Sequence, residues 1–367
     1  MATDTVAQKS GRSSRCRTAR VPRSKGFHST HGRVTFTVSA SLAFIGAGGI
    51  ASKHLSHLED NRLADVVAVC DIDESAAQRG AEPHGADVYT DWQAMFDDGG
   101  FDAVLICVPP FAHEGQELRA IEEDVHLFVE KPLGLEIEYA RSVLDELRGT
   151  DLLTQVGHHM RYQDNVRFAR ETVADRELAT IYGQWVGGVA GGEDHWWRHR
   201  ERSGGQVIEQ STHTFDLVRY FGGDVERVSA EGDLRVRTDL LDFPDAVSAT
   251  LRHEDGLPSH VMTSAASPSH ANGITLVGDD VHLDLYGNVC EGVVDGEEVS
   301  FEGSNDGHHS EVDAFVNAVI EEDQELCRSP YEDAINTFAV TLAVTDAVEA
   351  EGPIEVTAEA EPPVEVA

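Results

Sequence analysis

Lys131 is one of only two lysines after residue 40, in a stretch of chain that carries 65 acidic side chains. It stands in the tripeptide Glu130-Lys131-Pro132, directly after an apolar run. Lysine presents a compact point charge, whereas arginine presents a planar fork, so lysine suits a donor to one reacting oxygen. A surface lysine beside a turn proline is the alternative. We predict a functional lysine, provided that other chemical motifs reach the same place.

A second chemical cluster combines Glu209, His213 and Asp216. The spacing predicts one helix over 205–221, on which residues at i, i+4 and i+7 share a face. A carboxylate beside a histidine orients the imidazole and raises its basicity, as a general acid/base requires. The alternatives are a solvated surface pair and a metal site, for which two ligands are too few. We therefore predict Glu209 and His213 as catalytic residues and no metal.

The segment Gly46-x-Gly48-x-x-Ala51 lies between an apolar strand and a helix. The first glycine allows the tight turn, the second lets the backbone approach a pyrophosphate, and the alanine permits close packing of helix on sheet. Asp71 ends the next strand, at a spacing typical of an acid that binds the adenosine ribose. Capping of the following helix is its alternative role. We expect a dinucleotide site that also includes Gly49 and Ile50. It should prefer NAD to NADP, because residues 70–77 contain no Lys or Arg.

From about residue 35 strands and helices alternate, which predicts a doubly wound parallel sheet over residues 35–158. Ligands of such sheets gather at the carboxyl ends of the strands. Lys131 follows one strand end, so it should face the same crevice as the glycine loop. The other cofactor contacts expected at this edge are Pro109, His113 and Glu130. Residues 159–355 contain turn-separated strands and predict a C-terminal α+β domain with a large, mostly antiparallel open sheet.

Charge is unevenly distributed along the chain. The net charge is −38, yet residues 1–40 carry +7 and the remainder −45. We predict a disordered basic extension over residues 1–34, or a misassigned start, and a frayed acidic tail over 356–367. The acidic, lysine-poor body resembles proteins of salt-adapted (halophilic) organisms and argues against nucleic-acid binding, which needs clustered Lys and Arg. No apolar run is long enough for a membrane span, and five cysteines without a CxxC pattern suggest reduced thiols in the cytoplasm.

Taken in order, three motifs resemble those of the glucose-fructose oxidoreductase / inositol dehydrogenase (Gfo/Idh/MocA) family: Gly46-x-Gly48-x-x-Ala51, Glu130-Lys131-Pro132 and Gly204-Gly205-x-x-x-Glu209-x-x-x-His213-x-x-Asp216. The resemblance spans about residues 40–355. It implies an N-terminal Rossmann domain, an open C-terminal sheet that often builds dimers or tetramers, a substrate-contacting Lys131 and an acid/base His213. The chain departs from the family in two places: Glu209 replaces the Asp of many members, and residues 157–162 lack the usual Asn.

Together these motifs predict an NAD(P)-dependent oxidoreductase that transfers hydride between nicotinamide and a hydroxyl of a sugar or polyol. His213, aided by Glu209, would accept the hydroxyl proton, and Lys131 would stabilise the developing alkoxide. The expected substrate contacts are Arg161, Trp197 and Asp216. The alternatives are a non-catalytic, sugar-responsive NAD(P)-binding regulator and an NAD-dependent glycoside hydrolase or lyase of the same fold.

Overall fold

The computed structural model describes residues 26–30, 33–37, 39–192, 194–304, 306–350 and 352–357, and the chain divides into two compact units, residues 1–37 and 38–367. In the first unit, β1 (Gly26–Thr30) and β2 (Arg33–Thr37) pair as an antiparallel hairpin. Of the extension predicted over residues 1–34, the described part is 26–30 and 33–34, and the prediction of disorder stays a prediction. Apolar and polar residues alternate in 33–37, as a strand requires. Residues 1–25 of the predicted extension, and the predicted tail beyond residue 357, lie outside the described residues.

The second unit begins with a six-stranded parallel sheet in the order β5-β4-β3-β6-β7-β8, the order of a Rossmann domain. Its strands are β3 (Ala40–Ile45), β4 (Ala64–Cys70), β5 (Asp87–Tyr89), β6 (Ala103–Ile106), β7 (His126–Val129) and β8 (Thr154–Val156). The connecting helices are α1 (Gly49–Leu58), α2 (Glu74–Ala81), α3 (Trp92–Asp98), α4 (Gln116–Glu122) and α5 (Ile137–Leu147). Ala43 and Ile45 of β3 pack in the core that contains α3, α4 and α5, whereas Leu42 and Phe44 pack in the core that contains α1 and α2. Both faces of this sheet are covered, which is why its strands are apolar throughout.

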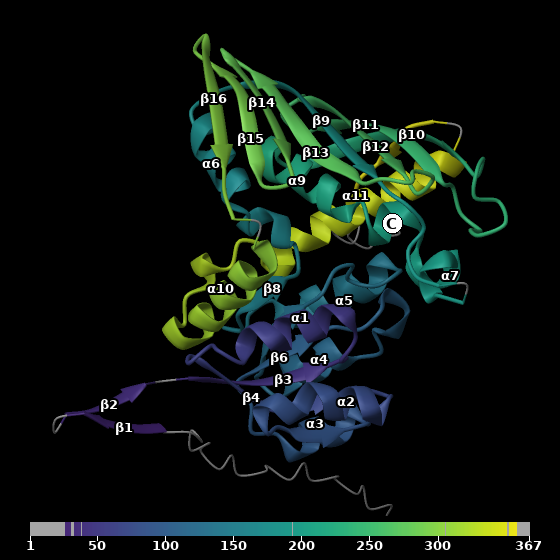
Figure 1. The fold of residues 1–367 in the computed structure, drawn as a ribbon. Helices are drawn as coiled ribbons and strands as arrows, with labels where there is room; N and C mark the ends of the chain where they lie inside the picture. Colours follow the sequence, from purple (N-terminus) through teal and green to yellow (C-terminus); the bar gives the residue numbers. More distant parts are fainter. Residues whose placement is uncertain are drawn as a thin grey trace, which may run out of the picture. The chain divides into compact units, whose positions relative to one another are not determined.

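A nine-stranded sheet follows, in the order β16-β15-β14-β13-β9-β12-β11-β10-β17 (Figure 1). Its strands are β9 (Leu178–Val186), β10 (Val225–Asp233), β11 (Ala246–His253), β12 (Pro258–Ser264), β13 (Ala271–Gly278), β14 (Val281–Tyr286), β15 (Val289–Val294), β16 (Glu297–Glu302) and β17 (Ile354–Glu355). The described strands pair antiparallel, except that β9 and β12 are parallel. Helices α6 (Asp164–Val173), α9 (Thr212–Gly222) and α11 (Tyr331–Glu349) cover one face of the sheet (Figure 1). The predicted fold class is thus confirmed.

The last two helices pack on both sheets. Val312 and Phe315 of α10 (Gly307–Glu321) join Phe44 in a core of the parallel sheet. The first half of α11 packs beside the same sheet through Phe338, and the second half packs under the nine-stranded sheet through Val344. Residues after 158 therefore stabilise both halves of this unit. Within the described ranges, no helix combines the length and apolarity that a bilayer span demands.

The prediction of one helix over 205–221 is wrong. The chain forms α8 (Gln206–Glu209) and α9, with Gln210 and Ser211 between them. The Ser211 hydroxyl donates a 2.9 Å hydrogen bond to the carbonyl of Gln206, and such side-chain bonds compete with helix continuation. Glu209 and His213 therefore belong to different helices. The remaining short elements are α7 (Arg200–Ser203), η1 (Glu82–His84), η2 (Pro110–Ala112), η3 (His159–Tyr162), η4 (Trp196–Arg198) and η5 (Gln324–Leu326).

Candidate active site

The glycine loop between β3 and α1 is shaped to receive a ligand. Gly46 has φ +93°, and a Cβ there would lie 2.3 Å from the carbonyl oxygen of Cys107, so only glycine fits. At Gly48 and Gly49, by contrast, a Cβ would meet nothing within 4 Å. Gly48 also begins α1 without a side-chain cap, which leaves the first N–H groups of the helix available to an anion. Ala51, within α1, is fully buried, as close packing of this helix on the sheet requires.

Asp71 lies at the carboxyl end of β4, beside this loop. Its Oδ2 accepts a 2.7 Å hydrogen bond from the backbone N–H of Ala47, and its Oδ1 accepts one of 2.8 Å from Asp73. These bonds hold the carboxylate in place and leave lone pairs for ribose hydroxyls. The next residue, Ile72, is 97% exposed and lines the cavity into which the glycine loop faces. Ile72 was not among our predicted site residues, although it directly follows the predicted ribose-binding Asp71.

A cavity of about 890 Å³ connects the glycine loop to the two catalytic candidates. Ten of the predicted site residues line it: Gly46, Gly48, Gly49, Ile50, Asp71, Pro109, Glu130, Lys131, Glu209 and His213. His113, predicted to contact the cofactor, does not line it, and its Nδ1 pairs with the buried carboxylate of Glu117. The parallel sheet and the segment around α8 and α9 thus supply one shared cavity.

Lys131 and Glu209 form an ion pair across this cavity. The Lys131 ammonium donates a 2.7 Å hydrogen bond to the Glu209 carbonyl and lies 3.1 Å from its Oε1. The two side chains are 15% and 11% exposed. Because the helix is interrupted after Glu209, the carboxylate of Glu209 contacts Lys131 and the side-chain amide of Gln210. The predicted Glu209–His213 partnership therefore differs from the contacts that Glu209 makes here.

His213 stands on α9 among other aromatic rings. Its ring centroid is 4.5 Å from that of His159 and 5.6 Å from that of Trp185. Its Nδ1 is buried and has no hydrogen-bond partner among the described residues. Burial, followed by the neighbouring His159 and Lys131, holds the pKa of His213 well below its usual value. The imidazole is therefore neutral near pH 7, the form that accepts a proton.

The three predicted substrate contacts do not line the cavity. Arg161 donates to both carboxylate oxygens of Asp216, at 2.8 and 2.6 Å, and both side chains are buried. Burial opposes ionisation of Asp216, but Arg161 and His158 outweigh it and lower the pKa to about 2. Trp197 is 1% exposed and packs against Phe243. Such burial does not favour substrate contact, and the Arg161–Asp216 pair instead fixes α9 against η3.

Glu130 is a buried carboxylate beneath Lys131. Its Oε1 lies 2.8 Å from Nε2 of His54, on α1. Burial raises the pKa of Glu130, but the His54 hydrogen bond reverses the shift and the net pKa is lowered. Glu311, on α10, lies near this pair. The potential ligand atoms of His54, Glu130 and Glu311 are within 4.8 Å of one another, so among the described residues these three could together hold a metal ion. Burial and the charge of Glu130 raise the pKa of Glu311 well above its usual value, which keeps it protonated.

Several cavity residues were not among our predicted site residues. Phe111 and Trp196 line the cavity, with ring centroids 6.0 Å apart, and supply aromatic wall. His159 and His308 also line it, as does Lys53. His308 comes from α10, 86 residues after the end of α9, so no local sequence pattern could indicate its position.

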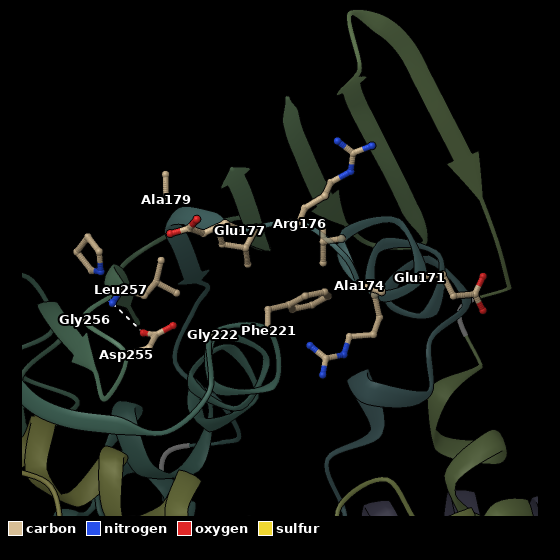
Figure 2. Close-up of a pocket in the computed structure, with 14 residues that line it drawn as sticks. Glu171, Ala174, Arg176, Glu177, Ala179, Phe221, Gly222, Asp255, Gly256 and Leu257 are labelled. Carbon is tan, nitrogen blue, oxygen red and sulfur yellow. Dashed lines mark hydrogen bonds between the residues drawn. The ribbon is translucent and has the colours of Figure 1, made fainter. Parts of the chain in front are cut away.

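A second cavity of about 710 Å³ lies where α6 meets β9 and the turn before β12, and Figure 2 shows its lining residues. Its lining contains none of the predicted site residues. Two of its arginines are already engaged, since Arg176 pairs with Asp295 and Arg170 stacks on the ring of Tyr220. The catalytic candidates therefore belong to the first cavity alone.

Comparison with known proteins yields two family matches. Residues 40–158 match the model of an oxidoreductase family with an NAD-binding Rossmann fold, and residues 166–287 match the Gfo/Idh/MocA C-terminal domain. The myo-inositol 2-dehydrogenase of Thermotoga maritima is 27% identical over 263 residues, 67% of this chain and 72% of the relative. The D-glucoside 3-dehydrogenase of Escherichia coli K12 is 31% identical over 226 residues, 59% of this chain and 64% of the relative. The solved myo-inositol 2-dehydrogenase of Lactobacillus plantarum has a TM-score of 0.74 at 20% identity, covering 87% of this chain and 100% of that one.

Proposed function

The chain belongs to the Gfo/Idh/MocA family of NAD-binding oxidoreductases, and on that premise we propose that it oxidises a hydroxyl of a sugar, polyol or related small molecule. The observation that carries this proposal is one cavity that holds an open glycine loop, the Lys131–Glu209 pair and a neutral His213. A cofactor cradle that opens onto a point donor and a proton acceptor meets the needs of a dehydrogenase.

The residues present fit a dinucleotide. The open space over Gly48 and Gly49 suits a pyrophosphate at the start of α1, and Asp71 suits the ribose. When bound, the dinucleotide supplies the hydride acceptor, and the protein supplies placement and charge.

Lys131 and His213 divide the work on the substrate hydroxyl. An ammonium has three N–H donors, and Glu209 engages two of those on Lys131, which leaves one for the substrate oxygen. That donor would stabilise the developing alkoxide. The neutral imidazole of His213 would accept the hydroxyl proton. Glu209 acts as the positioning residue for Lys131, in place of the role of partner to the base that the sequence suggested.

We also propose a preference for NAD over NADP. Asp71, Asp73 and Glu74 follow β4, where the adenosine ribose would lie. A 2′-phosphate there would be repelled by these carboxylates and would displace the hydrogen bonds of a 2′-hydroxyl.

A homo-oligomer, a dimer or tetramer, is a further part of the proposal. The face of the nine-stranded sheet away from α9 exposes Tyr182, Tyr286 and Val293, which are 40%, 45% and 42% exposed. Burial of these three side chains by a second copy would stabilise an assembly. A cytoplasmic location rests on the thiols: in the described chain Cys70, Cys107, Cys290 and Cys327 are unpaired.

The test is NADH formation by the purified protein in molar KCl, with a panel of inositols, glucosides, aldoses and sugar acids. We expect steady NADH production with at least one member. His213→Ala should abolish it, whereas Arg227→Gln, at an exposed position of β10 outside the lining, should not. Absence of net NADH with every member would contradict a dehydrogenase, and bond cleavage without net NADH would identify the hydrolase or lyase alternative.

A further inference from the structure

Both lysines of the acidic body line the same cavity. After residue 40 the chain has only Lys53 and Lys131, and both stand among the lining residues. Lys131 is held by Glu209, as described above. Lys53, on α1, is exposed and forms no ion pair within the part of the chain that the structure describes. A body that carries −45 thus places an uncompensated positive charge at this site.

Three imidazoles stand at the same end of the cavity as Lys53. His159 comes from η3, His213 from α9 and His308 from the first turn of α10, which packs beside α1. The ring centroids of His159 and His308 are 3.7 Å apart, and those of His159 and His213 are 4.5 Å apart. Burial lowers the pKa of His308 to about 4, with Lys53 adding to the effect against the charge of Glu130. In the free protein these rings are neutral N–H donors that a bound negative charge would help to protonate.

Two of the three carboxylates near this end carry no free negative charge. Glu209 is paired with Lys131, and burial raises the pKa of Glu311 well above its usual value. Glu130 is ionised, but it is buried and hydrogen-bonded to His54, whereas Lys53 is exposed. A neutral polyol needs hydrogen bonds but no net positive charge, whereas a carboxylate or phosphate needs both.

We propose that the substrate carries an anionic group, a carboxylate or a phosphate, which Lys53 binds together with His159 and His308. This inference rests on the proposed function and names the substrate class: a sugar acid or sugar phosphate rather than a neutral polyol. Lys131 and His213 then act on the hydroxyl, while Lys53 and its two histidines hold the charged end of the same molecule.

The experiment compares matched substrates that differ in charge: glucose, glucuronate and glucose 6-phosphate, then galactose and galacturonate. Steady-state kcat/KM is measured for wild type, Lys53→Gln and Lys53→Arg at several KCl concentrations. We expect Lys53→Gln to lower kcat/KM for the anionic members by about 10- to 100-fold, as for one lost charge-assisted hydrogen bond, and to spare the neutral members. Lys53→Arg should retain most of the preference. Arg227→Gln removes the same charge elsewhere and serves as the control.

Two results would overturn the proposal. An equal loss for neutral and anionic members would show that Lys53 has no role in charge recognition. A weakened NAD affinity in Lys53→Gln, with unchanged selectivity, would assign the lysine to the cofactor's pyrophosphate. Comparison of glucuronate with glucose 6-phosphate decides between carboxylate and phosphate.

Direct binding keeps this inference separate from the proposed function. If wild type reduces no NAD with any sugar, the dehydrogenase proposal fails. Calorimetric titration of the NAD-loaded protein with glucuronate, glucose 6-phosphate and glucose still tests the site. We expect tighter binding of an anionic sugar that Lys53→Gln removes, and equal affinities in both proteins would contradict the anion site.

Discussion

Replacement of Lys131 by methionine should abolish turnover while the cofactor still binds. The ammonium donates two hydrogen bonds to Glu209, at 2.7 and 3.1 Å, and keeps a third donor for the cavity. Loss of one preorganised transition-state donor costs about 100- to 1,000-fold in kcat. The substitution also leaves the Glu209 carboxylate, 11% exposed, without its cation. Such an uncompensated group costs roughly 1–3 kcal/mol of folding free energy, so Tm should fall as well.

The assay separates these two effects. Single-turnover NADH formation measures chemistry, fluorescence titration with NADH measures cofactor affinity, and calorimetry measures Tm. We expect kcat to fall about 100-fold or more while Kd for NADH changes by less than about threefold. The double variant Lys131→Met/Glu209→Gln should recover Tm but not kcat, because it removes the unpaired charge without restoring the donor. Turnover within a few-fold of wild type would refute the role of Lys131.

Three further predictions follow from the same geometry. Asp71→Ser should lower the ratio of kcat/KM for NAD to kcat/KM for NADP, and a higher wild-type kcat/KM for NADP would contradict the placement of Asp71. High salt should reduce the preference for NAD without abolishing it, because the Debye length falls to about 3 Å at 1 M. Burial, then His159 and Lys131, hold the pKa of His213 well below its usual value, so the acid limb of kcat/KM should lie well below the pH at which an ordinary histidine titrates. Persistence of that limb in an active His213→Ala variant would identify another base. Burial lowers the pKa of His158 to about 4, so between about pH 6.5 and pH 4 the unfolded chain binds a proton on this residue and the folded chain does not. The free energy of unfolding should therefore decrease as the pH falls, by about 2 kcal/mol from His158 at pH 5. Urea titrations of His158→Asn should show a smaller decrease over the same pH range.

The sequence predicted the regular elements that depend on local pattern. The glycine loop lies between a strand and a helix, as its pattern predicted. The break after Glu209 was missed, because Gln210 and Ser211 carry no glycine or proline signal. The break arises from a serine hydroxyl that bonds to earlier carbonyls, which a pattern of apolar spacing cannot reveal.

The site was predictable in part for a related reason. Strand ends of a parallel sheet meet at one edge, so the placement of Lys131 in the same cavity as Gly48 followed from topology. Arg161 and Asp216 were expected at the substrate, yet they bury a mutual ion pair, since charge type alone does not say which side of a helix faces a cavity. His308 reaches the cavity through tertiary packing of α10, so only the folded structure could identify it.

Deuterium transfer tests the central claim most directly. Wild-type protein and NAD are mixed in molar KCl with each member of a panel of sugars, sugar acids and inositols deuterated at carbon. The mass of the nicotinamide cofactor is then measured by mass spectrometry. If Lys131 and His213 serve hydride transfer, reduced cofactor forms with one deuterium from the substrate carbon, and both Lys131→Met and His213→Ala lose this product. Cofactor that stays oxidised with every member of the panel, or deuterium transfer that survives in both variants, would contradict the account.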